Sequence, residues 1–312
     1  MKITKKETKI VIIMKITKKE TKIVIIGGGP AGATAAIQMA RYGLPALLIE
    51  RREIGGLLWN ANLIENYPGF PSGVSGKKLI GLLKKQMERV GVDIERAEVS
   101  HVDWAEERFT ITTDVAEYSA NYLIVASGTK SNPLPNVIQA DVRKWVWTEV
   151  WPLSDIKDTH VAIVGAGDAA FDYALNLSKN RNIVTILNRG DSVKCLRLLF
   201  DRASKEPCIN YWKNVALKEI KTSNWPTRIE VRCDTEEGED VSIYVDHVLF
   251  AIGRRPNLDF LSERIRDLES ELVASGRLYF AGDVKNDQLR QVAIAAGDGL
   301  RAAMQIYSRM RK

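Results

Sequence analysis

The sequence of 312 residues predicts an α/β protein built from two similar units, the second inserted into the first. An aliphatic run, a glycine turn and an alanine-rich amphipathic stretch follow one another from Lys22 to Gly43, and the same order returns from His160 onward. Alternating apolar and polar residues over 98–128 and 228–252 predict a small antiparallel sheet beside each parallel sheet. A final buried strand is expected at Tyr122–Ala126.

The chain begins with a direct repeat. Residues 1–13, MKITKKETKIVII, recur unchanged as residues 14–26, and only the second copy leads into the glycine turn. We interpret the first copy as a duplicated tail without a role in the fold, and we expect the first unit to begin at Met14. The expected division is a first unit over 14–130 and 256–312 and a second unit over 131–255.

Composition and charge limit the class of protein. With 45% hydrophobic and 27% charged residues the chain has a globular composition, and no aliphatic run reaches the roughly 20 residues of a membrane span. No secretory signal is recognisable, so a cytoplasmic protein without membrane contact is expected. The charge of +6 fits a nucleotide phosphate or an acidic electron-carrier protein, although a solvated basic surface would have the same charge. No element interleaves basic and aromatic residues, so nucleic-acid binding is not expected.

The cysteines give no redox or metal motif. Cys195, Cys208 and Cys233 are the three cysteines, and no two of them have CxxC spacing. We interpret them as structural thiols and expect neither a disulfide scaffold nor a metal site. The histidines fall in expected strands, so no catalytic acid or base is nominated.

The first glycine turn has the pattern of a dinucleotide site. Gly27, Gly29 and Gly32 form G-x-G-x-x-G between a strand and a helix. The first glycine permits a tight turn, the second lets a pyrophosphate approach the backbone, and the third lets helix and strand pack closely. Glu50 ends the next strand, where an acid can accept hydrogen bonds from a ribose 2′-hydroxyl. The alternative is a tight turn followed by a surface glutamate.

The second glycine turn predicts a nicotinamide nucleotide site. Gly165, Gly167 and Ala170 form the G-x-G-x-x-A variant, and the next strand leads to Arg189 instead of an acid. An arginine can pair with a 2′-phosphate that a carboxylate would repel, and Lys194 lies close behind, so the residues favour NADP over NAD. The alternative is a set of basic residues at a solvated helix start.

Segments from Met14 to the C-terminus resemble those of a known family, in the right order and at nearly the right spacing. They include GGGPAG, IENYPGF, VASGT, GAGDAAFDYAL, AIGRRPN and LYFAGDVKNDQLRQVAIAAGDG. Together they resemble the low-molecular-weight thioredoxin reductases, FAD-dependent pyridine nucleotide oxidoreductases. The resemblance implies two Rossmann-like domains, FAD in the first and NADP or NAD in the second, a homodimer, and rotation of the nicotinamide unit during catalysis.

The resemblance also implies the residues of each site. Those for FAD are Gly27, Gly29, Pro30, Ala31, Gly32, Glu50, Arg51, Gly56, Leu57, Leu58, Asn66, Val99, Gly128, Gly282, Asp283, Gln291 and Val292. Those for NAD(P) are Gly165, Gly167, Asp168, Ala169, Ala170, Arg189 and Lys194.

The sequence departs from this family at its redox centre. Members that reduce thioredoxin carry CxxC before the second glycine turn, because the flavin passes electrons to that disulfide. Aligned on the following Pro-Leu, Val146 and Glu149 occupy the two cysteine positions, so no dithiol route is expected and no catalytic residue is identified. Asn188 and Gly190 interrupt the family's 2′-phosphate pattern, which leaves the nicotinamide preference open, and Leu57 replaces a common glutamine.

These features leave three functional hypotheses. The leading one is an FAD-dependent oxidoreductase that passes electrons from NAD(P)H through the flavin to an acceptor other than a disulfide, such as ferredoxin or another acidic carrier. The alternative is a flavin-binding protein or complex subunit without turnover, and the third is a thioredoxin-disulfide reductase that uses cysteines elsewhere. The tryptophan-rich residues 144–153 either fill a domain interface or lie against the flavin.

Overall fold

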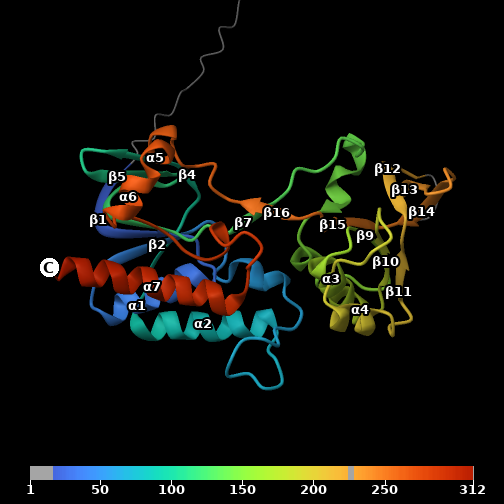
Figure 1. The fold of residues 1–312 in the computed structure, drawn as a ribbon, viewed down its shortest axis with the longest axis horizontal. Helices are drawn as coiled ribbons and strands as arrows, with labels where there is room; N and C mark the ends of the chain where they lie inside the picture. The colour runs from blue at the N-terminus through green and yellow to red at the C-terminus, as the bar shows by residue number, and fades with distance from the viewer. Residues whose placement is uncertain (1–16, 224–227, 312) are drawn as a thin grey trace, which may run out of the picture.

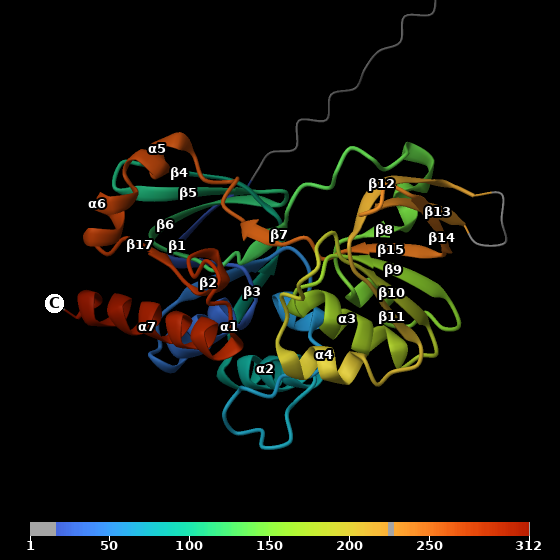
Figure 2. The ribbon, with the colours of Figure 1, turned by 45° about the vertical axis from the view of Figure 1, so that its right-hand side comes forward.

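The computed structural model describes residues 17–223 and 228–311. The chain forms two units side by side, each with helices packed against a parallel sheet (Figures 1 and 2). The predicted α/β fold class is confirmed. The duplicated tail over 1–13 and the expected start at Met14 lie outside the described residues.

The first unit contains a seven-stranded sheet in the order β3-β2-β1-β6-β5-β4, with β17 beside β6. Its elements before the second unit are β1 (Thr17–Ile26), α1 (Pro30–Arg41), β2 (Ala46–Glu50), the 3₁₀ helix η1 (Gly56–Asn60), α2 (Gly76–Val90), β3 (Asp93–Arg96), β4 (Val99–Ala105), β5 (Arg108–Thr113), β6 (Ala116–Val125) and β7 (Thr129–Ser131). Those after it are α5 (Glu263–Asp267), α6 (Glu269–Ala274), β17 (Leu278–Phe280), η4 (Gly282–Val284) and α7 (Val292–Met310).

Strand β6 joins the parallel and antiparallel parts of this sheet. One edge of β6 pairs in parallel with β1 along its whole length, while the other edge pairs antiparallel with β5 and then parallel with β17. The expected antiparallel strands are present, and they are joined to the parallel strands because one ten-residue strand, β6, continues through both parts. The predicted strand Tyr122–Ala126 corresponds to the last part of β6, where burial changes from alternating to continuous.

Alternate residues of β1 pack into two different cores. Ile23 and Ile25 face α1 and α7, where they meet the buried alanines of both helices. Val24 and Ile26 face the opposite side, where Phe109 of β5 belongs to the same core. Because successive side chains of a strand point to opposite faces, this four-residue buried run needs cover on both sides, as the continuous apolar pattern predicts. Figure 1 shows α1, α2 and α7 together below the sheet.

The second unit contains a five-stranded parallel sheet, β11-β10-β9-β15-β8, and a three-stranded antiparallel sheet, β12-β13-β14. Its elements are η2 (Ala140–Trp145), β8 (Val146–Trp147), η3 (Trp151–Leu153), β9 (His160–Val164), α3 (Asp168–Ser178), β10 (Ile183–Leu187), α4 (Arg197–Ala203), β11 (Ile209–Trp212), β12 (Val215–Thr222), β13 (Ile229–Thr235), β14 (Asp240–Val245), β15 (His247–Phe250) and β16 (Arg254–Pro256). The expected antiparallel sheet is present, but it begins at β12, and β15 belongs to the parallel sheet instead.

The two units are connected by a pair of short antiparallel strands. In this pair β7 runs beside β16, with Arg254 opposite Ser131 and Pro256 opposite Thr129. Figure 1 shows the pair between the two units. The predicted boundaries near 131 and 255 fall within it. A division at those residues stays a prediction, which the membership of the sheets on either side supports.

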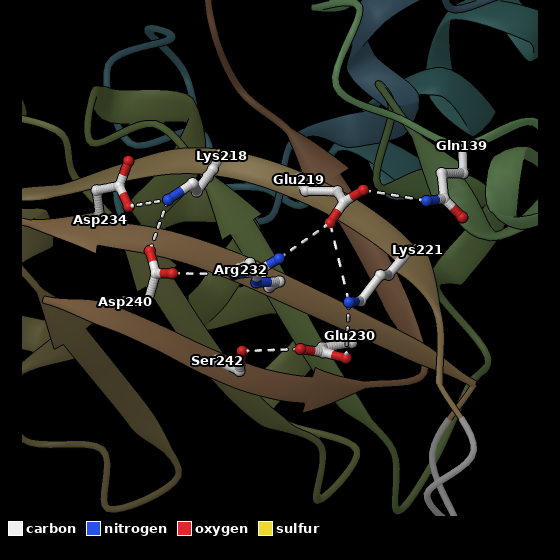
Figure 3. A network of polar contacts seen from close by, with 9 residues as sticks. All are labelled: Gln139, Lys218, Glu219, Lys221, Glu230, Arg232, Asp234, Asp240 and Ser242. Atoms are coloured by element: carbon white, nitrogen blue, oxygen red, sulfur yellow. Dashed lines mark hydrogen bonds and ion pairs between the residues drawn. The ribbon is translucent and has the colours of Figure 1, made fainter.

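One face of the three-stranded sheet carries a network of charged side chains (Figure 3). Lys218 Nζ lies 3.0 Å from Asp234 Oδ1 and 2.7 Å from Asp240 Oδ1. Arg232 continues the network, at 2.9 Å from Asp240 Oδ2 and 3.4 Å from Glu219 Oε2. The hydrogen bond from Lys218 is the main cause that lowers the pKa of Asp240 to about 2. Because these partners are exposed and mutually paired, we interpret the network as a solvated surface of the sheet.

Candidate functional site

The first glycine turn is built so that no other residue fits at two of its positions. Gly27 has φ +103°, and a Cβ atom there would lie 2.4 Å from Ala126 O. A Cβ atom at Gly32 would lie 1.8 Å from Gly27 O, inside the contact between the turn and α1. The turn therefore lies tightly between β1 and β6 and directs the N-terminus of α1 towards the space beyond the strands, as a pyrophosphate site requires.

Glu50 lies at the end of β2 and supports the same turn. Its Oε2 accepts a hydrogen bond from Gly28 N at 2.6 Å, and its Oε1 accepts one from Arg52 N at 2.9 Å. A cavity of about 270 Å³ opens beside it. The residues that line this cavity are Ile26, Gly27, Ile49, Glu50, Arg51, Ala97, Glu98, Val99, Ser100, Ser127, Asn257, Asp259 and Phe260.

Four residues of the predicted FAD set line this cavity, namely Gly27, Glu50, Arg51 and Val99. Sequence reasoning missed the side provided by residues 257–260, which follow β16 and return to the first unit only after the second. Ser127 Oγ donates a hydrogen bond to Asn257 O at 2.7 Å, which joins the returning chain to the cavity wall. The Asn257 backbone N–H also bonds Gly128 O at 3.0 Å, so the predicted Gly128 contributes to this contact.

The turn after β17 places a half-buried carboxylate, that of Asp283, in η4. Burial raises the pKa of Asp283, while Arg290 and Arg254 act in the opposite direction. Among residues 17–223 and 228–311, no hydrogen-bond partner of the Asp283 carboxylate is found. Asp298 holds the turn in place, because it accepts hydrogen bonds from Gly282 N at 3.2 Å and from Asn286 Nδ2 at 2.7 Å. A half-buried carboxylate at this turn can accept hydrogen bonds from a ligand that carries hydroxyl groups.

Other predicted FAD residues meet from distant parts of the chain. Asn66 Nδ2 donates to Gln291 Oε1 at 2.8 Å, across 225 positions of sequence. A Cβ atom at Gly56 would lie 3.1 Å from Gly29 Cα, so the first turn and η1 approach closely. The remaining predicted positions lie in these same elements, with Pro30 and Ala31 in α1, Leu57 and Leu58 in η1, Gly282 in η4 and Val292 at the start of α7.

The second glycine turn is open at the position where a pyrophosphate would approach. Gly165 packs against Ala251, whereas a Cβ atom at Gly167 would meet no atom within 4 Å. The predicted Asp168, Ala169 and Ala170 form the first turn of α3.

The chain after β10 returns to this turn. Lys194 N bonds Ala166 O at 3.2 Å, and Leu196 N bonds Asp168 Oδ1 at 2.7 Å. The backbone of Lys194 therefore lies beside the turn, and Arg189 is exposed nearby in sequence.

Asn188 has a structural role in this loop. It is 8% exposed, and its Nδ2 donates to Ser192 O at 3.1 Å and to Tyr211 Oη at 2.8 Å. Its Oδ1 accepts from Gly190 N at 3.3 Å. Because the amide is fully used inside the loop, Asn188 offers no donor to a 2′-phosphate, and only Arg189 and Lys194 of the predicted set carry positive charge.

The two positions aligned with the family's cysteines lie in different surroundings. Val146 lies in β8, where it pairs with Val248 of β15. Glu149 lies two residues beyond β8, and its Oε1 forms a 2.8 Å ion pair with Arg254 Nη1. No disulfide forms within the described residues. Burial raises the pKa of the Cys195 thiol, and burial raises the pKa of the Cys233 thiol to about 11. Neither of these two thiols is suited to act as a thiolate.

The tryptophans are not gathered at one place. Trp147 Nε1 donates to His247 Nδ1 at 3.3 Å, inside the second unit, and Trp145 lies under Lys144 Nζ at 4.2 Å. Trp151 is 40% exposed. Trp147 is therefore partly buried within the second unit. The backbone N–H of Trp151 bonds Asn60 Oδ1 of the first unit at 3.2 Å, so this end of the segment lies between the units, which is one of the two positions that the sequence suggested.

No group of three His, Cys, Asp or Glu side chains suited to a metal ion occurs in the described part of the chain. None of the helices over 17–223 and 228–311 is long and apolar enough to cross a membrane.

Two glycine turns at the ends of parallel strands, a cavity beside an acidic strand end and a half-buried carboxylate are typical of an oxidoreductase with two nucleotide-binding units. Consistent with this class, the pyridine nucleotide-disulphide oxidoreductase family matches residues 21–299, and the chain belongs to this family. The expected cofactors, FAD with NADP or NAD, agree with membership of the family.

Several similar proteins are thioredoxin reductases. One from Streptomyces clavuligerus is 32% identical over 293 residues, which cover 89% of this chain and 90% of that protein. The solved thioredoxin reductase of Lactococcus lactis, described as the FR conformation, is 27% identical with TM-score 0.80, covering 92% of this chain and 98% of that one. The solved enzyme of Streptococcus pyogenes is 26% identical with TM-score 0.56, covering 94% and 98%. The chain is therefore a thioredoxin reductase-like oxidoreductase.

Proposed function

We propose that this protein is an FAD-dependent oxidoreductase that takes hydride from NAD(P)H and passes electrons from the flavin to an acceptor other than a disulfide. The observation that carries the proposal is the ion pair at Glu149, which stands where the family's disulfide-reducing members hold a cysteine. A carboxylate cannot exchange disulfides, and the raised pKa of Cys195 and of Cys233 favours their unreactive thiol forms.

The residues fit the two cofactors in different ways. For FAD, the first glycine turn would hold the pyrophosphate, Glu50 the adenosine ribose and Asp283 the ribitol hydroxyls. For the nicotinamide nucleotide, the open turn at Gly167 would hold the pyrophosphate, and Arg189 with Lys194 would pair with a 2′-phosphate. The bound flavin would supply hydride and single-electron chemistry, while the protein positions both rings and excludes water.

The test is an anaerobic titration of the flavin-loaded protein with NADPH and then with NADH, followed by the visible spectrum. Loss of the oxidised flavin band with either nucleotide is the expected result, and the two rates rank the coenzymes. The same measurement after alkylation of the cysteines should give unchanged reduction. Loss of acceptor turnover on alkylation, with flavin reduction unchanged, would instead favour the third hypothesis, a disulfide reductase that uses other cysteines.

A second candidate is a flavin-binding protein or complex subunit that does not turn over. It is favoured by the 2′-phosphate loop, where Asn188 is used internally and Gly190 brings no charge. The titration separates the two candidates, because a bound flavin that stays oxidised with both nucleotides would support the second one.

The partners and the location are also part of the proposal. The net charge of +6 supports an acidic electron carrier, whose reduction should slow as ionic strength rises. Leu300 and Met304, which are 38% and 50% exposed on α7, support association into a homodimer, which sedimentation can measure. A cytoplasmic location is proposed from the sequence alone.

A further inference from the structure

The segment that carries Glu149 is attached to the first unit by one buried amide. Asn60, at the end of η1, is 4% exposed, and its Oδ1 accepts hydrogen bonds from Val150 N at 3.1 Å and Trp151 N at 3.2 Å. Its Nδ2 donates to Glu149 Oε2. A single side chain of the first unit therefore binds three consecutive residues of the second.

The other oxygen of Glu149 is bound by Arg254. Arg254 Nη1 lies 2.8 Å from Glu149 Oε1, and the two side chains are 18% and 21% exposed. The remaining N–H groups of Arg254 donate to Thr129 Oγ1 and Thr129 O, both at 2.9 Å, and its Nη1 also lies 3.2 Å from Ser131 Oγ. Glu149 is thus tied to the strand pair that connects the units. Since both carboxylate oxygens are engaged, the geometry does not favour Glu149 as a proton donor or base.

Further polar contacts between the units fall on the same stretch of the first unit, residues 60–77, which we call the docking strip. Asp172 of α3 accepts a hydrogen bond from Asn62 N at 3.0 Å. Arg202 of α4 binds both oxygens of Glu65, at 2.6 and 3.0 Å. Figure 2 shows α3 and α4 turned towards this part of the first unit.

The docking strip also belongs to the candidate flavin site. Asn66 lies within it and bonds Gln291, the residue before α7, and both are predicted to lie by the flavin. A contact that fixes the second unit on this strip therefore fixes its glycine turn relative to the flavin site.

The solved relatives superpose on this arrangement of the two units to different extents. The two solved reductases described above align over nearly the whole chain at nearly equal identity, yet only the Lactococcus lactis structure superposes closely. Different placement of two otherwise similar units produces such a contrast. We propose that Glu149 is a positioning residue, and that its bonds to Arg254 and Asn60 clamp the second unit on the docking strip in the arrangement shared with that structure.

The test compares Glu149→Ala and Glu149→Gln in the full chain loaded with FAD. Amide hydrogen exchange should increase over the docking strip and at Val150 and Trp151 in the alanine variant, while β1 and β9 stay protected. The rate constant of flavin reduction at saturating NADPH should fall roughly 10- to 100-fold, which corresponds to the loss of one charge-assisted hydrogen bond. The KM for NADPH should stay unchanged, because the nucleotide turn itself is intact.

Glu149→Gln should lie between the wild type and the alanine variant, because the new side chain keeps the size and one acceptor. If Glu149→Ala does not fold, the same two measurements on Glu149→Gln decide the question. The matched control is Asp158→Asn, which removes an ion pair with Arg181 at 2.6 Å that lies entirely within the second unit.

The clamp would be overturned if both Glu149 variants showed the same hydrogen exchange over the docking strip and the same rate of flavin reduction as the control. Faster flavin reduction in the Glu149 variants would also overturn it. Only the expected change in the rate of flavin reduction rests on the proposed function. If the wild-type flavin is not reduced at all, the proposed function fails and hydrogen exchange alone decides the clamp.

Discussion

The Asp172→Asn variant should stabilise the protein at neutral and higher pH. Asp172 is partly buried where α3 meets the docking strip, and burial raises its pKa from the ordinary 3.8 to about 6, while the Asn62 N–H and Lys179 oppose the rise. A carboxyl whose folded pKa is raised binds its proton more tightly in the folded state. Stability is therefore lost as the pH rises from the unfolded pKa through the folded pKa, and the loss is complete above about 6.

The size of the effect follows from the two pKa values. With a folded pKa near 6 and an unfolded pKa of 3.8, ionisation of Asp172 lowers the free energy of unfolding by about 2 kcal/mol between about pH 4.5 and about pH 8. This is an upper value, because the group is only partly buried. Asparagine keeps an oxygen that can accept the Asn62 N–H but does not ionise. The free energy of unfolding of Asp172→Asn should thus rise by up to this amount relative to wild type over the same range.

Urea unfolding of Asp172→Asn and wild type at about pH 4.5 and about pH 8 measures the difference in the free energy of unfolding, with the FAD concentration held constant. Asp158→Asn is the control of opposite sign, because the Arg181 guanidinium lowers the pKa of Asp158. A stability difference between Asp172→Asn and wild type that does not change with pH, or that becomes less favourable at high pH, would refute the burial argument.

Two further variants test the cofactor sites. Gly27→Ala places a Cβ atom 2.4 Å from Ala126 O in a left-handed turn, so we expect the purified protein to retain little FAD per chain; near-stoichiometric FAD would contradict the predicted site. Arg189→Ala and Lys194→Ala remove the predicted 2′-phosphate partners, so each should raise the KM for NADPH roughly tenfold or more and leave that for NADH unchanged. Equal effects on both nucleotides would assign these side chains to another part of the ligand.

The local patterns of the sequence were sufficient for the fold class and the two glycine turns. The buried run Ile23–Ile26 and the tight contacts of Gly27 depend on neighbours that the strand, turn and helix order already implies. The sequence did not show that the antiparallel strands of the first unit are joined to its parallel sheet, because an alternating stretch and a buried stretch in direct succession can form one strand, as β6 does. Pattern alone does not show where a strand changes partner.

At the candidate site, contacts between residues far apart in the sequence could not be predicted. The sequence identified Glu149 as a departure from the family, but its partners Asn60 and Arg254 lie 89 and 105 positions away and belong to other elements. The cavity wall at 257–260 was missed for the same reason. Asn188 also illustrates the limit, since its substitution was visible while its bonds to Ser192 and Tyr211 depend on the folded loop.

The antiparallel pair β7–β16 holds together the two ends of the long stretch of chain between them. Ser131, the last residue of β7, lies directly opposite Arg254, the first residue of β16. The ends of the inserted stretch are therefore neighbours, so a short turn could join them without moving the strands of the flavin unit. Such an arrangement lets a nucleotide-binding module be exchanged, shortened or lost during descent while the surrounding sheet is preserved.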